Sequence, residues 1–483
     1  MLLKAQELLN RISPRNQNLC LVIGVFLISR SMNIFYFDIR FDLGPLGYYW
    51  QYIDPKLLKE HLVQSVYYLH SQPPLFNFFL GVVLKLFPHN YLEAFHFIYM
   101  FFGLLFSISL FLIMTEIGIG NKRSLILTCL FMISPITVEY ENWLFYEYPT
   151  AVLLSWAVFF LHRFVRRKRP LDCFTFFLLI SMVVYVRGIL SLYWFLLVAV
   201  ILWAFNWREW KKIVLACSLP LFLILALYVK NFIVFNSFSI GDAQIGSNLA
   251  LTVTSSLPQD TADALIIQRK ITSLFRVPPF SPDFSNYAPY GLYFKTTGVP
   301  ILDEKSRSTD SINPHNLIYL EVGKIDLKDA VYVLMRFPVY VLKECGSNLL
   351  NGYFLTSDHT QPFYAGDCSG QWNRWDDFFK RVCLGEVNSG RYLFLLLGLP
   401  IIFIYGLFFI LRSRVNPYKY SSRVEVVAFM MVTIVFLAGS TLFVYCDYSR
   451  YRFLVDSFYL VLFGMATKEL VQCWKCFFKF NRE

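Results

Sequence analysis

The stretch HSQPPLFNFFLGVVLKLFP (70–88) decides how the chain is arranged in a membrane. An apolar run at 74–87 is bounded by Pro73 and Pro74 at its start and by Pro88 at its end. As a helix this run would be about 21 Å long, which is shorter than the ~30 Å hydrocarbon core of a bilayer. We therefore predict an interfacial or re-entrant helix that does not cross.

The amino-acid composition predicts a membrane protein. Of 483 residues, 56% are hydrophobic, 19% aromatic and only 16% charged, and the mean hydropathy is +0.49. A soluble protein has about 25% charged residues, so this chain has too few to cover a globule in water. Disordered, collagen-like and disulfide-dense secreted classes are excluded as well. The long apolar runs indicate membrane helices rather than membrane strands.

Ten further apolar runs are the predicted crossings, and the basic residues between them fix their direction. Lys and Arg concentrate in cytoplasmic loops. If 74–87 crossed, Lys122, Arg123 and the cluster HRFVRRKR (162–169) would lie outside; if it does not cross, every basic cluster is cytoplasmic. These clusters also account for the net charge of +11, so nucleic acid is not a predicted partner. The predicted crossings are 18–37, 91–114, 125–138, 150–162, 171–186, 188–205, 213–229, 391–411, 424–445 and 453–471.

The sequence thus predicts an all-α polytopic membrane protein of about ten transmembrane helices with an external domain of mixed helix and loop. Residues 1–229 form an N-terminal transmembrane module with a large first external loop at 38–90. Residues 230–390 form the external domain, and 391–483 form C-terminal transmembrane helices. Within the first loop, we expect a membrane-surface helix at 55–69, because its leucines share one face.

Two features bear on the compartment. The first apolar run follows Arg11 and Arg15 without a clear cleavage site, so it is expected to stay as an anchor. Cysteines in the external segment can pair in an oxidising compartment. The three cysteines available for such a pair are Cys345, Cys368 and Cys383, and the sequence leaves open whether any two of them are joined.

Charged and polar residues gather at the external ends of the predicted helices. Such residues are costly near a bilayer and are functional candidates by default. Each has a plain structural explanation, such as snorkelling or helix capping, but together they put acids and cations on one membrane face. Cations there would hold a lipid phosphate, and a carboxylate would take a proton from an attacking group. The residues are Asp38, Asp42, His70, Gln72, Glu139, Glu141, Glu147, Arg187, Lys230, Arg450, Arg452 and Asp456.

The order of these motifs resembles the GT-C glycosyltransferases, in particular the branch of protein O-mannosyltransferases and lipid A aminoarabinose transferases. That branch has an acid in the first external loop, then K/Q-P-P-L before an interfacial helix, two crossings joined by a basic turn, and a second acidic loop. This chain has FDIRFD (37–42), QPPL (72–75), the basic Lys122–Arg123 turn and the acidic loop 139–149 in that order. The resemblance covers roughly residues 15–230 and RYRFLVD (450–456).

The resemblance implies a hexosyl- or pentosyltransferase that carries a sugar from a polyprenyl phosphate to an external acceptor, which is a glycan, a lipid or a protein. Asp42 would be the general base, since Gly44, Pro45 and Gly47 after it indicate a shaped loop. Asp38 stays an alternative, because the branch has two adjacent acids where this chain has acids four residues apart.

The resemblance also implies roles for the other polar residues. Glu141 and Glu147 would position the acceptor or bind a cation. His70 and Gln72 would shape the pocket. The lipid phosphate would be held by Arg187, Lys230, Arg450 and Arg452. No metal or other cofactor is predicted, since no His/Cys cluster supports zinc, although the acids leave room for a divalent cation.

Location and two alternative functions complete the predictions. The sequence has no N-x-S/T site, which favours a bacterial inner membrane with the active site facing the periplasm. A transporter or flippase of a lipid-linked saccharide would instead need charges near the bilayer midplane and broken helices in paired halves. The third possibility is a membrane scaffold whose external domain is a binding module.

Overall fold

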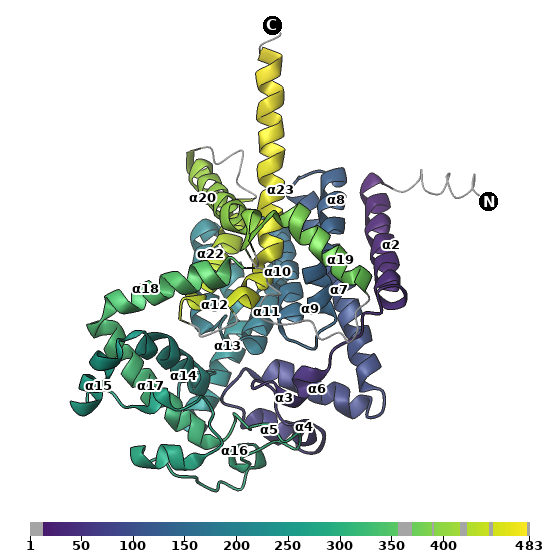
Figure 1. Ribbon diagram of the computed structural model, residues 1–483. Coiled ribbons are helices and arrows are strands. Elements are labelled where there is room, and N and C mark those ends of the chain that lie inside the picture. The colour runs from purple at the N-terminus through teal and green to yellow at the C-terminus, as the bar shows by residue number, and fades with distance from the viewer. Residues whose placement is uncertain (1–12, 356–369, 389–390, 416–422, 444–447, 481–483) are drawn as a thin grey trace.

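The computed structural model describes residues 13–355, 370–388, 391–415, 423–443 and 448–480 (Figure 1). Its described part is almost wholly helical, with one short antiparallel pair, β1 (Glu386–Asn388) and β2 (Arg391–Tyr392). The bundle consists of α2 (Pro14–Phe35), α7 (Tyr91–Glu116), α8 (Asn121–Met132), α9 (Pro135–Glu141), α10 (Glu147–Arg167), α11 (Pro170–Val186), α12 (Leu192–Phe205), α13 (Trp210–Phe235), α20 (Leu399–Val415), α22 (Val424–Thr441) and α23 (Tyr448–Phe480).

Each of the ten predicted apolar runs is helical over most of its described residues, which confirms the all-α polytopic membrane class. Among the described residues, six helices are long and apolar enough to cross a bilayer, or seven if the bent pair α8 and α9 counts as one. The helices α11 and α12 are shorter, with 17 and 14 residues. The number of crossings beyond seven therefore stays a prediction.

One predicted crossing, 125–138, is broken into α8 and α9, which meet at 60°. Pro135 is the first residue of α9, where a backbone N–H would have no partner within the helix. The Ser134 hydroxyl caps the helix by accepting a hydrogen bond from the Thr137 N–H at 3.3 Å. As a result, Glu139 and Glu141 lie in α9 and are buried. The expectation that 139–149 is a loop was therefore wrong for residues 139–141, which belong to a helix.

The first loop contains four helices, of which α6 (Pro74–Leu86) is the predicted short helix behind the two prolines. The single helix expected at 55–69 is broken at His61 into α4 (Pro55–Glu60) and α5 (Leu62–Tyr67). Both pack on α6, where a Cβ at Gly81 would lie 2.2 Å from Leu62 Cδ1. The fourth helix is α3 (Gly44–Tyr48).

The segment after α13 forms a separate group of helices at one end of the bundle (Figure 1). These are α14 (Asp242–Val253), α15 (Gln259–Ile267), α16 (Pro300–Asp303), α17 (Leu317–Arg336) and α18 (Pro338–Asn348). The predicted domain start at residue 230 falls inside α13. The backbones of α14 and α17 cross closely, since a Cβ at Gly246 would lie 1.9 Å from the Gly323 carbonyl oxygen.

The segment that follows α18 returns to the bundle. A π-helical turn, η5 (Leu349–Tyr353), contacts α23, and α19 (Gly370–Phe379) packs against α9. A second π-helical turn, η6 (Lys380–Leu384), follows. Cys345 and Cys383 are free thiols, while Cys368 lies outside the described residues.

Candidate functional site

Three charged side chains from three helices meet at the end of the bundle where α10 and α23 begin. Glu147 is the first residue of α10, Arg187 directly follows α11, and Arg450 lies in the first turn of α23. Glu147 Oε1 lies 3.2 Å from Arg187 Nη2 and 3.3 Å from Arg450 Nε, and all three side chains are buried. We call these residues the arginine cluster. Two guanidinium groups share one carboxylate, so the cluster carries a net positive charge.

Aromatic residues surround the arginine cluster. Arg450 donates a hydrogen bond to the Tyr49 hydroxyl, and Arg187 donates one to the Tyr146 hydroxyl. The guanidinium of Arg450 lies 4.7 Å above the Phe145 ring, and that of Arg187 lies 4.5 Å above Tyr146. These cation–π contacts and hydroxyl acceptors compensate part of the cost of burying two cations.

Asp42 is fixed next to the chain segment that leads into α10. Its N–H donates to the Asn142 carbonyl at 2.7 Å, and its carbonyl accepts from the Leu144 N–H at 2.9 Å. The half-buried carboxylate accepts a hydrogen bond from the Gly44 N–H at 2.7 Å. Burial raises the pKa of Asp42 above its usual value. Among the residues that the structure describes, Asp42 forms no ion pair, so a carboxylate with increased proton affinity stands in the loop.

A stack of rings joins Asp42 to the arginine cluster. Trp143, which pairs with Asp42 through the backbone, stacks on Phe145 with ring centroids 4.0 Å apart. The Arg450 guanidinium in turn lies over the ring of Phe145. The structure thus brings Asp42, predicted as the base, into one region with three of the predicted substrate-binding residues.

Glu141 belongs to a different network. It forms a two-pronged ion pair with Arg30 of α2, with Nε–Oε1 at 2.7 Å and Nη2–Oε2 at 2.6 Å. Tyr148 donates a hydrogen bond to Oε2 at 2.7 Å, and Arg30 also donates to the Met132 carbonyl at the α8–α9 break. Both partners are buried. Glu141 therefore holds α2, α9 and α10 together. The sequence interpretation missed Arg30, although an arginine inside the apolar run 18–37 is itself a signal.

Asp38 is exposed and follows the end of α2. Its backbone is left-handed, with φ of 51°, and its carboxylate pairs with the exposed Arg40 at 3.3 Å. An exposed pair of this kind contributes little. Of the two candidate bases, Asp42 is the one that lies against the site.

Three predicted site residues lie instead where the segment before α6 contacts α13 and the helices that follow it. His70 Nε2 hydrogen-bonds the His315 carbonyl at 2.9 Å, and Gln72 bonds Gln244. Lys230 donates to the carbonyls of Tyr67 and Leu69. Burial lowers the pKa of His70 to about 4 and that of His315 to about 3, so both rings are neutral near pH 7. The geometry ties these residues to the interface rather than to the arginine cluster.

Arg452 lies on another face of α23. It donates to the Tyr353 carbonyl at 2.7 Å and pairs with Asp456 at 3.1 Å. Arg452 and Asp456 line a mostly apolar cavity of about 190 Å³ between α8, α9, α23 and the segment around 379–399. Phe453, which also lines it, follows Arg450 by one helical turn. The cavity therefore begins about one helical turn after Arg450 along α23.

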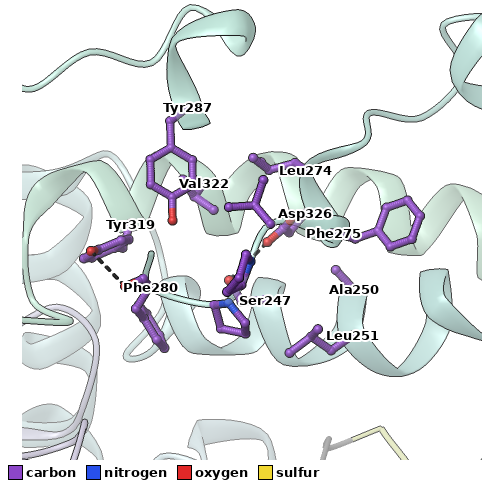
Figure 2. A pocket seen from close by; sticks show the side chains of 13 residues that line it. Ser247, Ala250, Leu251, Leu274, Phe275, Phe280, Tyr287, Tyr319, Val322 and Asp326 are labelled. Carbon is purple, nitrogen blue, oxygen red and sulfur yellow. Dashed lines mark hydrogen bonds between the residues drawn. The ribbon is translucent and has the colours of Figure 1, made fainter. Parts of the chain in front are cut away.

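A second cavity lies between α14, α17 and the segment 274–287 (Figure 2). Its volume is about 10 Å³. There the Ser247 hydroxyl donates to the Asp326 carboxylate at 3.1 Å, and burial raises the pKa of Asp326 to about 7. The volume suits a single water molecule. Within the described part of the chain, no group of three or more His, Cys, Asp or Glu side chains is arranged to hold a metal ion.

Comparisons with known proteins add one likeness. No family model and no curated protein matches the chain. Among solved structures it is similar to the archaeal oligosaccharyltransferase AglB from Archaeoglobus fulgidus, in complex with an inhibitory peptide and a dolichol-phosphate. The sequence identity is 12% and the TM-score 0.32, over 94% of this chain and 51% of that one. This chain thus spans about half the length of that protein. Such a low TM-score establishes no common function, which has to follow from the site.

Proposed function

We propose that this chain is a membrane glycosyltransferase that moves a sugar from a polyprenyl phosphate to an acceptor hydroxyl at the external face. The observation that carries the proposal is the position of Asp42. Asp42 has a half-buried carboxylate with a raised pKa, and its backbone partner Trp143 stacks on Phe145, the ring that lies under Arg450. Arg450 and Arg187 are buried and share the carboxylate of Glu147. A base and a phosphate-binding group are the two parts that the reaction needs.

The arginine cluster suits a phosphate that leaves. Breaking the sugar–phosphate bond adds negative charge to the phosphate, and fixed cations stabilise that charge in a site with little water. Arg450 also lies in the first turn of α23, a helix of 33 residues, where the positive end of the helix dipole favours an anion. Glu147 keeps the two guanidinium groups together until the phosphate binds.

The apolar cavity suits the isoprenoid chain of the donor. It runs beside α23 from Arg452 and Phe453 toward Leu460 and Phe463. A chain that lies there would leave its phosphate at the start of α23, close to Arg450. In this proposal the arginines supply the positive charge for the reaction.

The chemical step is a displacement at the anomeric carbon. Asp42 takes the proton of the acceptor hydroxyl, whose oxygen forms a bond to that carbon. The bond from the anomeric carbon to the phosphate oxygen breaks, and its electron pair leaves with the polyprenyl phosphate. The carboxylic acid then releases its proton to water.

The proposal includes the side of the membrane. α10 runs for 21 residues, about 31 Å, from Glu147 to the basic pair Arg166 and Arg167. With the basic end in the cytoplasm, the arginine cluster faces the other compartment. For a bacterial inner membrane, that compartment is the periplasm.

The test is turnover in proteoliposomes that contain a polyprenyl-phosphate sugar. Asp42→Asn keeps the shape and removes the base, so we expect a loss of turnover of at least about 100-fold with donor binding retained. Asp38→Asn, a matched change four residues away, should stay within about twofold of the wild-type chain, as surface changes do. Unchanged turnover in Asp42→Asn would refute the proposed mechanism.

A flippase of the same donor is the second candidate, because α8 and α9 form a broken helix with a buried charge pair beside it. Carriers use such breaks. Movement of a fluorescent lipid-linked saccharide across sealed vesicles, without acceptor, would favour this function over transfer.

A further inference from the structure

The loop after Asp42 exposes two aromatic rings. Tyr48 is 50% exposed and Trp50 is 45% exposed. Tyr49 between them has extended backbone (φ −72°, ψ 129°) and points inward, where its hydroxyl meets Arg450 and its ring lies 4.4 Å from Phe145. Two exposed rings therefore lie on either side of a residue that points inward.

The Tyr48 ring stands next to the candidate base. A Cβ built at Gly44 would lie 2.9 Å from Asp42 Oδ1 and 3.3 Å from Tyr48 Cε1. Carboxylate and ring thus border the same small space in front of Gly44. A molecule stacked on the ring would have a hydroxyl within reach of Asp42.

The external segment holds this loop in place. Thr309 and Ser311 donate hydrogen bonds to the Gly47 carbonyl at 2.6 and 2.9 Å, and Arg307 donates to the Tyr49 carbonyl at 2.8 Å. The Trp50 ring meets Phe280 edge-on at 5.0 Å. The two rings are therefore fixed on both sides of Tyr49.

Exposed Tyr and Trp also occur in the aromatic belts of membrane proteins, where they sit at the lipid headgroups. The contacts of this loop point elsewhere. Trp50 packs on Phe280 and Gly47 is bound by Thr309, both from the segment between α13 and α17. Figure 1 shows α3 at the end of the bundle where the external helices lie. The rings line the boundary between the bundle and these helices.

We propose that Tyr48 and Trp50 form a stacking site for the acceptor, and that the acceptor is a carbohydrate. Rigid rings with flat apolar faces and a polar edge match the C–H face and the hydroxyls of a sugar ring. A peptide acceptor would instead use a strand edge or a helix groove. The inference rests on the proposed function and names the acceptor class for the same site.

The experiment uses the full chain in proteoliposomes with a polyprenyl-phosphate sugar. An oligosaccharide panel, a synthetic peptide and a phospholipid are offered as acceptors, and donor hydrolysis is measured without acceptor. Tyr48→Leu and Trp50→Leu should each raise the KM for the oligosaccharide about tenfold, while donor hydrolysis stays within about twofold. Tyr48→Phe, which keeps the ring, should restore the KM.

The control is Trp207→Leu, which removes an exposed Trp in the turn between α12 and α13. It should leave the KM unchanged. An unchanged KM in both Tyr48→Leu and Trp50→Leu, or transfer to the peptide or phospholipid alone, would overturn the stacking site and leave the glycosyltransferase intact. A wild-type chain that neither hydrolyses the donor nor transfers its sugar would overturn both proposals.

Discussion

At the scale of single residues, Arg30 and Glu141 form a buried ion pair with two hydrogen bonds. Arg30→Met leaves an unpaired carboxylate in an apolar setting, so we expect the free energy of unfolding to fall by about 3–5 kcal/mol. The double variant Arg30→Met with Glu141→Leu removes both charges and should recover most of that loss. Thermal unfolding in detergent measures both. A double variant less stable than Arg30→Met would contradict the assignment.

Asp326 gives a prediction about pH. Its pKa is raised to about 7 in the folded chain and is near 3.8 when unfolded. Between these values the folded state binds more protons, so the contribution of Asp326 to stability falls as pH rises through that window. Asp326→Asn removes this effect.

Melting curves at several pH values test that prediction. Asp326→Asn should gain stability over the wild-type chain between pH 5 and pH 8, on the order of 2 kcal/mol. Asp263→Asn alters an exposed pair with Arg276 and should show no such pH-dependent gain. A constant difference across the range for Asp326→Asn would count against a protonated Asp326.

Charged residues were easier to identify from the sequence than the partners that they contact. A charged residue at the end of an apolar run stands out in the sequence. Glu147, Arg187 and Arg450 could therefore be predicted as candidate site residues. The sequence does not indicate which residue a given charged side chain pairs with. Glu141 and Glu147 appear equivalent in the sequence, and only the structure shows that Glu141 pairs with Arg30. Tyr49 was missed because a tyrosine in a loop is ordinary until its partner is known.

At the scale of elements, α7 reaches the network of Glu141 only because it has a glycine there. A Cβ at Gly103 would lie 2.1 Å from Glu141 Oε2 and 2.8 Å from the Tyr148 hydroxyl. Gly103→Ala should therefore cost about 1–3 kcal/mol of stability, as overpacking does. Gly24→Ala in α2, where nothing lies within 4 Å of the new Cβ, is the matched control and should cost nothing. Equal stabilities of the two variants, measured by thermal unfolding, would contradict this packing.

Helices were predictable wherever an apolar run was long, because burying the backbone in lipid requires one. Their interruptions were harder to predict. Pro135 divides one run into α8 and α9, and the predicted surface helix breaks at His61, where no proline gives warning. The bounds of α14 to α18 were not predicted, because apolar residues alternate there with charged and polar ones, as in α17.

At the scale of the whole molecule, α6 decides the orientation of everything after it. Impermeant thiol labelling of Arg40→Cys and Lys122→Cys, each in a background without other reactive thiols, should modify the two sites from opposite sides of the membrane. The reason is that α7 alone lies between α6 and Lys122. Labelling from the same side would mean that α6 crosses, which would place Asp42 and the arginine cluster on different faces.

The most direct measurement is a structure of the full chain with a polyprenyl phosphate bound. We expect the phosphate at the first turn of α23, in contact with Arg450 and Arg187, and the isoprenoid chain in the cavity beside Phe453. The anomeric position of the donor should then face Asp42. A phosphate bound at the other end of α10, beside Arg166 and Arg167, would contradict the site and the function drawn from it.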